Sequence, residues 1–360
     1  MAVAESTIAT RPAFSWAELA PVAARYGSFE LVRALPSERD QNLLLRREAG
    51  GGEGGGAPEQ VVLKVHNPSD DLAFVECQNE ALELAAAAGA SCQRLLRTLE
   101  GGEPIVTIPL QEAACRCRAL TFLPGRMLAE AAASAAGAGE QAALWAAVGR
   151  AVGGLTASLL AFDHPAAHRE FVWDLRSCEE VIAARAADVG EERRPLLDGF
   201  LERHRREVVP LLPRLRLSVV HNDPNDYNLV VDDAGGVGVL DFGDMLYTYT
   251  CADAAICAAY LLFHCPEGAP LAESLLPFVR GFHERCPLTE AECEALFGLA
   301  VMRVCTSVCM SSYQGKLEPE NEYLLISAKP AWRLLERLAS EPAGEPPPAL
   351  LRRACGFAAA

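Results

Sequence analysis

Short runs of alternating apolar and polar residues occupy the first third of the chain, and this pattern predicts β-strands. Ser28–Leu35 and Leu43–Leu45 flank a polar turn over Pro36–Asn42. Val61–Val65 is a further expected strand, and it carries a lysine. Two or three more strands are expected over residues 95–123. This part of the chain should therefore form a small sheet.

Two helices are expected to accompany these strands. Ser15 and Glu18 have the spacing of a capping box, so a short helix should begin there and end near Tyr26. A longer helix is expected over residues 70–88, before Gly89. The first third of the chain thus predicts a β-rich region with one long helix.

Beyond Pro124 the pattern becomes mainly helical. Alanine-rich stretches predict helices over about 126–163 and 178–210, and residues 251–338 are expected to be helical with breaks. The breaks are expected near Pro266–Pro270, Pro287 and Lys316–Pro319.

A β-hairpin is expected between these helical stretches. Leu229–Asp232 and Val237–Leu240 are short apolar runs on either side of a turn at Asp233–Gly236. The hairpin matters because polar residues lie at its open end.

Together these elements predict an α+β, bilobal fold with a small β-rich lobe over residues 14–123 and a larger, mostly helical lobe over residues 124–340. The glycine-rich stretch 49–58 is expected to be a flexible loop, because its composition cannot form a packed core. Residues 1–13 and 341–360 are expected to form a flexible N-terminus and a loose tail.

The composition narrows the function classes. Of the 360 residues, 51% are apolar and 22% are charged, and the net charge of −16 argues against nucleic acid and anionic membranes as partners. No apolar run reaches about 18 residues and the N-terminus has no secretion or import pattern, so a cytoplasmic protein is expected. The 13 cysteines form no C-x-x-C pair, which favours reduced thiols over a structural zinc site.

Four polar residues around the hairpin suggest phosphoryl transfer. His221, Asp223 and Asn228 form a His-x-Asp-x-x-x-x-Asn loop before the first arm, and Asp241 follows the second arm. Because the arms are equal in length, Asn228 and Asp241 should lie side by side. An amide oxygen and a carboxylate suit a hard cation such as Mg²⁺. Asp223 could then accept a proton from an attacking hydroxyl, while His221 supports the loop through hydrogen bonds.

Lys64 lies in the strand Val61–Val65, and lysine is seldom fully buried without a partner. It could hold the phosphates of a nucleotide with the help of a carboxylate from the next helix, or it could be an edge lysine that reaches solvent. Glu76 and Glu80 lie one turn apart on the same face of that helix, and the spacing does not choose between them.

The turn Ser37–Asn42 could cover the same phosphates, with Asn42 as a candidate nucleotide contact. It contains no glycine, so a plain hairpin turn is an equal alternative.

Several segments resemble the aminoglycoside phosphotransferase and choline kinase group of small-molecule kinases, and within it the hydroxylysine kinases. The resemblance spans about residues 14–338. It rests on LPSERDQN (35–42), VVLKVHNPSDD (61–71), VECQNEAL (75–82), HNDPNDYN (221–228), GVLDFGDMLYTY (238–249) and PENEYLLISAKPAW (319–332). It implies a protein-kinase-like fold.

The resemblance also implies a reaction, the transfer of a phosphoryl group from GTP, or alternatively ATP, to the side-chain hydroxyl of 5-hydroxylysine. Carried over by motif, Asp223 would be the base, Asn228 and Asp241 the Mg²⁺ ligands, Lys64 the phosphate-binding lysine and Glu76 its partner. One departure is Asn222, which stands where the group has glycine between His221 and Asp223. Asparagine tolerates left-handed backbone angles, so the loop can form.

Three alternatives stay open. A related kinase would use another small hydroxyl acceptor, such as choline, ethanolamine, homoserine or an aminoglycoside. A silent nucleotide-binding module would bind without turnover. A metal-dependent hydrolase would leave Lys64 and the two-lobed pattern unexplained. The oligomeric state is open as well.

Overall fold

The computed structural model describes residues 11–48, 59–110, 113–317, 328–341 and 345–358. The chain divides into two compact units between Pro124 and Gly125. Residues 49–58, which were predicted to form a flexible loop, lie outside the described residues. Residues 1–10 of the predicted flexible N-terminus lie outside them as well.

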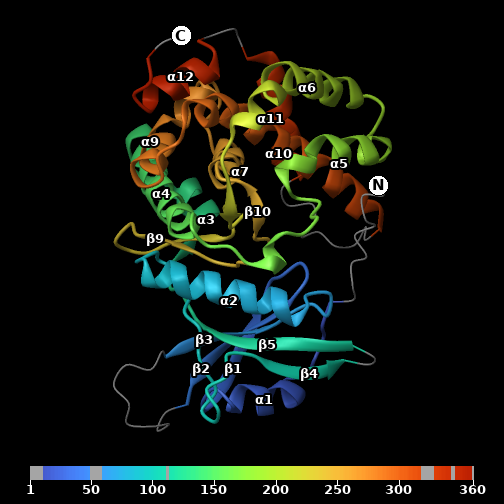
Figure 1. Ribbon diagram of the computed structural model, residues 1–360, viewed down its shortest axis with the longest axis vertical. Coiled ribbons are helices and arrows are strands. Elements are labelled where there is room, and N and C mark those ends of the chain that lie inside the picture. Colours follow the sequence, from blue (N-terminus) through green and yellow to red (C-terminus); the bar gives the residue numbers. More distant parts are fainter. Residues whose placement is uncertain (1–10, 49–58, 111–112, 318–327, 342–344, 359–360) are drawn as a thin grey trace. The chain divides into compact units, whose positions relative to one another are not determined.

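The first unit is built on a five-stranded antiparallel sheet in the order β1-β2-β3-β5-β4 (Figure 1). Its strands are β1 (Phe29–Leu35), β2 (Gln41–Arg47), β3 (Gln60–Val65), β4 (Val106–Leu110) and β5 (Ala113–Thr121). The predicted strands are confirmed, although β2 begins two residues earlier than expected because Gln41 and Asn42 already pair with β3.

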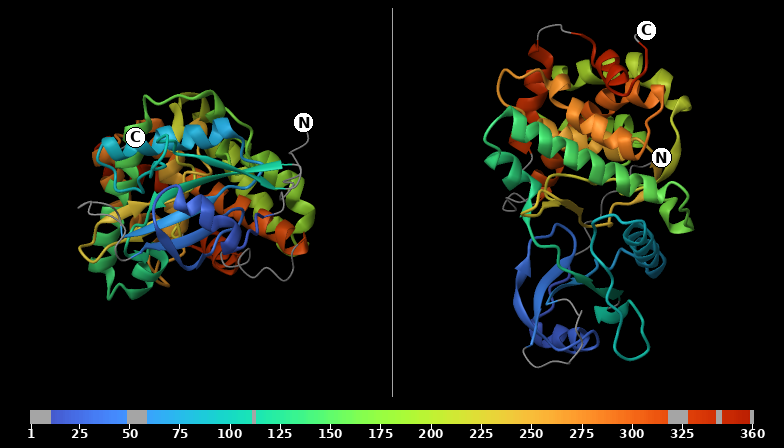
Figure 2. Two further views of the ribbon diagram at one scale, coloured as in Figure 1. Left: turned by 90° about the horizontal axis from the view of Figure 1, so that it is seen from below. Right: turned by 90° about the vertical axis from the view of Figure 1, so that its left-hand side faces the viewer.

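Helices cover the two faces of this sheet. α1 (Trp16–Ala24) begins at the predicted capping box and packs its Leu19 in one core with Leu63 of β3. It lies in front of the strands when the molecule is seen from below (Figure 2, left). α2 (Leu72–Ala87) lies on the opposite side of the sheet in Figure 1. Because alternate strand residues point to opposite faces, Lys64 points away from the α1 core.

The second unit is mostly helical, as predicted, but the predicted helical stretches are divided into shorter helices. The stretch 126–163 contains the two-residue strand β6 (Arg126–Met127) and two helices. The helices are α3 (Leu128–Ser134), α4 (Ala138–Leu159), α5 (Cys178–Arg185), α6 (Arg194–Glu207), α7 (Ala252–Leu262), α8 (Leu271–Ser274), α9 (Leu276–Arg285), α10 (Glu290–Leu317), α11 (Ala328–Ser340) and α12 (Pro347–Ala354). The α+β fold class is confirmed.

Among the described residues of this unit, β6 and four further strands form two small sheets. The predicted hairpin is confirmed as β8 (Leu229–Val231) and β9 (Val237–Val239), and β6 pairs with the outer side of β8. β7 (Leu217–Val220) pairs with β10 (Leu246–Tyr249), a pairing that the sequence pattern did not predict. These strands bracket the His221–Asn228 loop at both of its ends.

α10 is the central helix of this unit. By length and composition α4 and α10 could each cross a membrane, but 89% of the most apolar window of α10 is buried inside the protein. Contacts with surrounding helices therefore account for its apolar residues. α4 crosses α9 so closely that a Cβ atom on Gly149 would lie 2.1 Å from the backbone oxygen of Phe278, so only glycine fits there.

The predicted loose tail is wrong for residues 347–354, which form α12. Leu350 and Leu351 of this helix are buried, and Arg352 forms ion pairs with Glu290 and Glu294 of α10. The sequence suggested a tail because four prolines and a glycine occur in Glu341–Pro348. Prolines are tolerated in the first turn of a helix, and Pro347 and Pro348 occupy that position in α12.

The packing of α12 predicts a measurable stability effect. Because Leu351 is fully buried, Leu351→Ala should lower the free energy of unfolding by about 2–5 kcal/mol. Chemical denaturation of both proteins measures the difference, with Arg353→Ala as the matched control on the exposed face of the same helix. Equal midpoints for Leu351→Ala and the control would show that the end of the chain does not pack in solution.

Candidate active site

The hairpin brings the polar residues of the second unit together. The backbone N–H of Leu240 donates to the carbonyl of Asn228 at 2.8 Å, so Asp241 follows directly after the residue that pairs with Asn228. At the far end, the Asp232 side chain accepts from the backbone N–H groups of Ala234 and Gly236 and closes the turn. The equal arms therefore bring Asn228 and the start of the Asp241 segment to the same end.

His221 fixes the shape of the loop. Its Nδ1 accepts the backbone N–H of Asp223 at 3.2 Å, so the ring proton is on Nε2, which donates to the carbonyl of Leu240 at 2.8 Å. The fully buried carboxylate of Asp253 on α7 accepts the backbone N–H groups of His221 and Asn222. The loop is thus held from both sides by a ring and a carboxylate, which agrees with the supporting role expected for His221.

Two residues of this site have left-handed backbone angles. Asn222 has φ 64° and Asp241 has φ 56°, and among the described residues no other non-glycine residue has a positive φ. Such strain, about 1–3 kcal/mol for each residue, persists where the surrounding structure fixes the backbone, and it clusters at functional sites. The expectation that Asn222 adopts the left-handed conformation is confirmed.

This backbone conformation predicts how position 222 responds to substitution. Asn222→Gly should keep turnover within about twofold, because glycine adopts positive φ freely. Asn222→Val should destabilise the loop, because left-handed angles cost an ordinary residue about 1–2 kcal/mol and a β-branched residue more. Turnover and thermal unfolding of the two variants test this, and an active, stable valine variant would contradict the assigned backbone angle.

Both oxygens of the Asp223 carboxylate are held by N–H donors. Oδ2 accepts from the side-chain amides of Asn225 at 2.9 Å and Asn228 at 2.8 Å, and Oδ1 accepts from Arg303 at 2.9 Å. Burial raises the pKa of Asp223 well above its usual value, the nearby Asp244 carboxylate raises it further, and the Arg303 guanidinium opposes both. The side chain keeps 16% of its surface exposed, so a substrate can still reach it.

The sequence did not reveal Arg303 or Asp253. Arg303 comes from the middle of α10, is 3% exposed and stacks on Trp173, whose ring centre lies 4.5 Å from the guanidinium carbon. It also donates to the backbone carbonyl of Trp173. Asp253 is the one charged residue of α7, and Arg303 is the one charged residue between Glu294 and Lys316 of α10. That pattern was the available signal, because an isolated buried charge needs a partner.

Asn228 and Asp241 have the donor chemistry that Mg²⁺ requires. The Asn228 amide nitrogen donates to both the backbone carbonyl and the carboxylate of Asp223, so the amide oxygen points away from that residue. The Asp241 carboxylate accepts the backbone N–H of Gly243 at 3.0 Å, which orients it. An amide oxygen and an oriented carboxylate fit a hard cation.

In the first unit, three polar side chains form a row across one face of the sheet. Asn42 of β2 is directly opposite Lys64 of β3, which is directly opposite Arg118 of β5. The Asn42 side-chain oxygen is buried, and no described residue donates to it. Arg118 donates to the side-chain oxygens of Gln78 and Asn79 on α2, each at 2.6 Å.

The predicted partner of Lys64 is wrong. Glu76 and Glu80 are both exposed on α2, and the residues of that helix that point towards the sheet are the amides Gln78 and Asn79. Lys64 is instead in an ion pair with Asp40 at 2.8 Å. Helical spacing correctly put both glutamates on one face, but that face is turned to solvent.

Asp40 also belongs to a buried cluster with His66 and Asp70 whose ligand atoms lie within 4.8 Å of one another. Burial and then the Arg118 charge lower the pKa of His66, which keeps its ring neutral at pH 7. Lys64 and Arg39 pair with the two carboxylates, so their charges are already balanced. The cluster is therefore an ion-pair network rather than a metal site.

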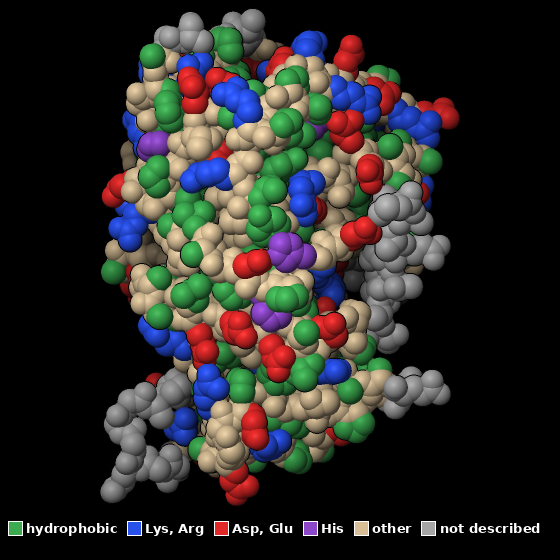
Figure 3. Space-filling model, viewed as in Figure 1, with side chains coloured by type: hydrophobic (Ala, Val, Ile, Leu, Met, Phe, Trp, Pro, Cys, Tyr) green, Lys and Arg blue, Asp and Glu red, His purple; other side chains and the backbone are tan. Residues whose placement is uncertain are grey.

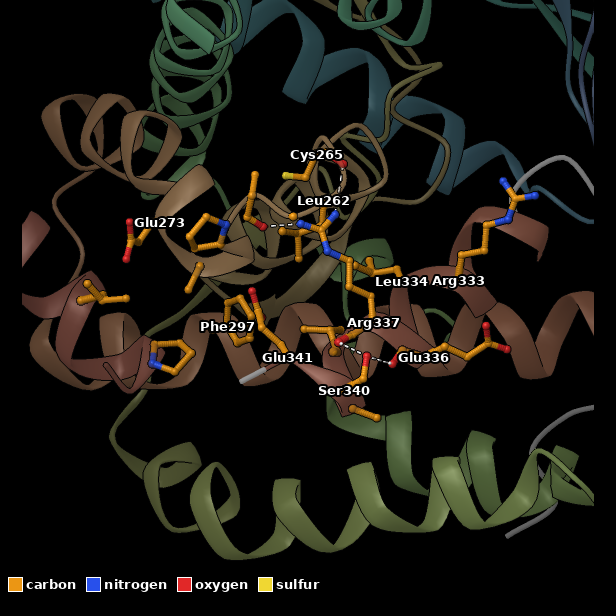
Figure 4. A pocket seen from close by; sticks show the side chains of 18 of the residues that line it. Leu262, Cys265, Glu273, Phe297, Arg333, Leu334, Glu336, Arg337, Ser340 and Glu341 are labelled. Carbon is orange, nitrogen blue, oxygen red and sulfur yellow. Dashed lines mark hydrogen bonds between the residues drawn. The ribbon is translucent and has the colours of Figure 1, made fainter. Parts of the chain in front are cut away.

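A cavity of about 1570 Å³ lies elsewhere in the second unit, next to α11 (Figure 4). Several of its charged side chains are already engaged. Arg337 donates to the backbone carbonyls of Cys265 and Ala269, and Glu341 accepts the backbone N–H of Leu271. None of the loop residues His221–Asn228 lines it. We therefore place no chemistry there.

Comparison with known proteins places the chain in a family. The model of the phosphotransferase enzyme family matches residues 33–285. The chain belongs to this family. Its curated relatives include hydroxylysine kinase of Mus musculus, which is 32% identical over 93% of this chain and 92% of the relative. Hydroxylysine kinase of Danio rerio is 31% identical over 92% of this chain and 94% of the relative.

Solved structures of two small-molecule kinases have the same fold. An amicoumacin kinase in complex with AMP-PNP, Ca²⁺ and Ami superposes with a TM-score of 0.66 at 16% identity, covering 90% of this chain and 94% of that one. A microcompartment-associated aminopropanol kinase gives 0.65 at 17% identity, covering 91% and 98%. The fold is the protein-kinase-like fold that the sequence resemblance implied.

The family also fixes the reaction class. The chain is a small-molecule kinase, a phosphotransferase that uses an alcohol group as acceptor.

On the face shown in Figure 3, acidic and basic side chains are interspersed, and neither sign gathers into one large patch there. The net charge of −16 therefore does not by itself indicate the acceptor.

Proposed function

We propose that this phosphotransferase transfers the γ-phosphoryl group of GTP to the side-chain hydroxyl of 5-hydroxy-L-lysine, giving 5-phosphohydroxylysine and GDP. The observation that carries the acceptor is the similarity to hydroxylysine kinases over more than nine-tenths of the chain. The contact of Asp223 with Asn228, next to Asp241, supports the reaction type.

Asp223 is the proposed general base. The acceptor hydroxyl oxygen attacks the γ-phosphorus, the bond from that phosphorus to the bridging oxygen breaks, and the hydroxyl proton passes to the Asp223 carboxylate. Asn225 and Arg303 hold one oxygen each, which aims the carboxylate. Burial raises the pKa of Asp223, which makes its carboxylate a stronger proton acceptor than an exposed aspartate.

Asn228 and Asp241 are the proposed ligands of Mg²⁺, which would neutralise charge on the transferring phosphoryl group. Lys64 and Asn42 are the proposed nucleotide contacts of the first unit. The orphaned side-chain oxygen of Asn42 supports its assignment, because a buried acceptor without a donor is costly unless a ligand satisfies it.

An acceptor panel tests the proposal. The purified protein is incubated with 5-hydroxylysine, choline, ethanolamine, homoserine or an aminoglycoside, each with GTP or ATP and with or without Mg²⁺, and nucleoside diphosphate is measured. The expected result is product only with 5-hydroxylysine and Mg²⁺, formed faster from GTP. A faster reaction with another acceptor would overturn the substrate, and nucleotide binding without turnover on any acceptor would indicate a silent module.

A further inference from the structure

A kinase lysine that contacts phosphate needs a carboxylate to hold its long, flexible side chain in place. The resemblance to known kinases assigned this task to a glutamate of the helix after β3. In this chain α2 presents Glu76 and Glu80 to solvent, while Lys64 is only 4% exposed. A solvent-facing glutamate cannot hold a buried ammonium, so the carboxylate must come from another element.

Asp40 has the required geometry. It lies in the turn immediately before β2, and its Oδ2 is 2.8 Å from the Lys64 ammonium, with the two side chains 11% and 5% exposed. Burial alone would raise the pKa of Asp40, but the charge of Lys64, its hydrogen bond to the carboxylate and the nearby His66 together more than offset burial and leave the pKa below its usual value. The Asp40 side chain is therefore a charged carboxylate at neutral pH.

The surrounding backbone fixes Asp40 in this position. Its Oδ1 accepts the backbone N–H of Asn67 at 2.9 Å, and its own N–H donates to Ser37 Oγ at 3.2 Å. Arg11 donates to its carbonyl at 3.0 Å. The turn before β2 is thus attached to the connection after β3, so both oxygens of the carboxylate are oriented.

α2 is attached to the sheet in a different way. Arg118, directly opposite Lys64 on β5, donates to the amide oxygens of Gln78 and Asn79. The contact between this helix and the sheet is therefore made by a guanidinium and two amides. Holding the lysine and anchoring the helix are separate tasks here.

We propose that Asp40, from the turn before β2, is the residue that positions the Lys64 ammonium for the nucleotide phosphates, in place of a glutamate from α2. An ammonium has three N–H donors and can contact a carboxylate and a phosphate together. The inference rests on the proposed nucleotide-binding role of Lys64, but not on the identity of the acceptor.

The test compares Asp40→Asn with Glu76→Gln, since each removes one carboxylate charge with little change in shape. Glu83→Gln serves as the matched control, because Glu83 is exposed on α2 and has no proposed role. Three quantities are measured for each variant. They are the dissociation constant of a fluorescent guanine nucleotide, the kcat and nucleotide KM with 5-hydroxylysine, and the thermal midpoint.

Asp40→Asn should weaken nucleotide binding about 10-fold or more, and Asp40→Glu should restore part of the loss. Glu76→Gln should match Glu83→Gln in every measurement. In combination with Lys64→Met, Asp40→Asn should have little further effect on binding, because the two residues act as a unit. A loss of nucleotide affinity in Glu76→Gln, or a lowered thermal midpoint with unchanged affinity in Asp40→Asn, would overturn the proposal.

The binding measurement separates this inference from the proposed function. If wild-type protein binds nucleotide but phosphorylates none of the acceptors, the proposed function fails while the Asp40 comparison can still be completed. If hydroxylysine is phosphorylated and Asp40→Asn binds nucleotide normally, only the positioning role fails.

Discussion

Asp223→Asn is expected to lower turnover about 10²–10⁴-fold, the usual contribution of a general base, with little change in nucleotide affinity. The amide has nearly the shape of the carboxylate but cannot accept the hydroxyl proton. Steady-state kcat with 5-hydroxylysine and the dissociation constant of a fluorescent nucleotide measure the two effects separately. Asp233→Asn, at an exposed position in the hairpin turn, is the matched control.

The substitution also removes the charge that balances Arg303. Breaking a buried ion pair from one side can cost about 3–5 kcal/mol, so thermal unfolding has to accompany the kinetics. The prediction holds if kcat falls in protein that is still folded at the assay temperature. Near-normal turnover in a folded Asp223→Asn variant would show that another group accepts the proton.

Asp241→Asn is expected to weaken the binding of the Mg²⁺–nucleotide complex. Mutation of groups that only support a metal ligand usually weakens metal binding by about 10–100-fold. Loss of a proposed direct ligand should therefore raise the Mg²⁺ concentration needed for half-maximal activity by at least that factor. Asparagine is the appropriate substitution, because it tolerates the left-handed angle of Asp241 and the backbone should stay in place.

A Mg²⁺ titration at saturating nucleotide measures this effect. Activity that returns at high Mg²⁺ would agree with a weakened metal site. An unchanged Mg²⁺ requirement would contradict the assignment, and a variant that is inactive at every Mg²⁺ concentration but binds the complex normally would point to a role in the chemical step instead.

Patterns confined to a few neighbouring residues predicted most of the fold. The strands of the first unit and the β8–β9 hairpin lie where alternation and turn residues placed them, since both patterns depend on contacts between nearby residues. The pairing of β7 with β10 and the docking of α12 were not predicted. Both depend on residues distant in the sequence, and a short apolar run does not specify its partner.

The same distinction applies to the site. The loop spacing indicated that Asp223 and Asn228 belong together, and their side chains are 2.8 Å apart. Arg303, 80 residues further along the chain, was missed because an arginine in an apolar helix does not indicate which carboxylate it meets. Helical spacing offered Glu76 and Glu80, and the resemblance favoured Glu76. Spacing shows which residues share a face of a helix, but not whether that face meets the sheet or solvent.

Local patterns in the sequence were enough to predict the hairpin, the loop that closes on it and the type of chemistry that an amide and two carboxylates can perform there. These follow from local spacing, because a short turn between equal arms permits few arrangements. Which charges balance one another became clear from the packing of the folded chain, where Arg303 pairs with Asp223 and Asp40 pairs with Lys64. A buried charge is stable only beside a partner, and that partner is chosen by how distant elements pack.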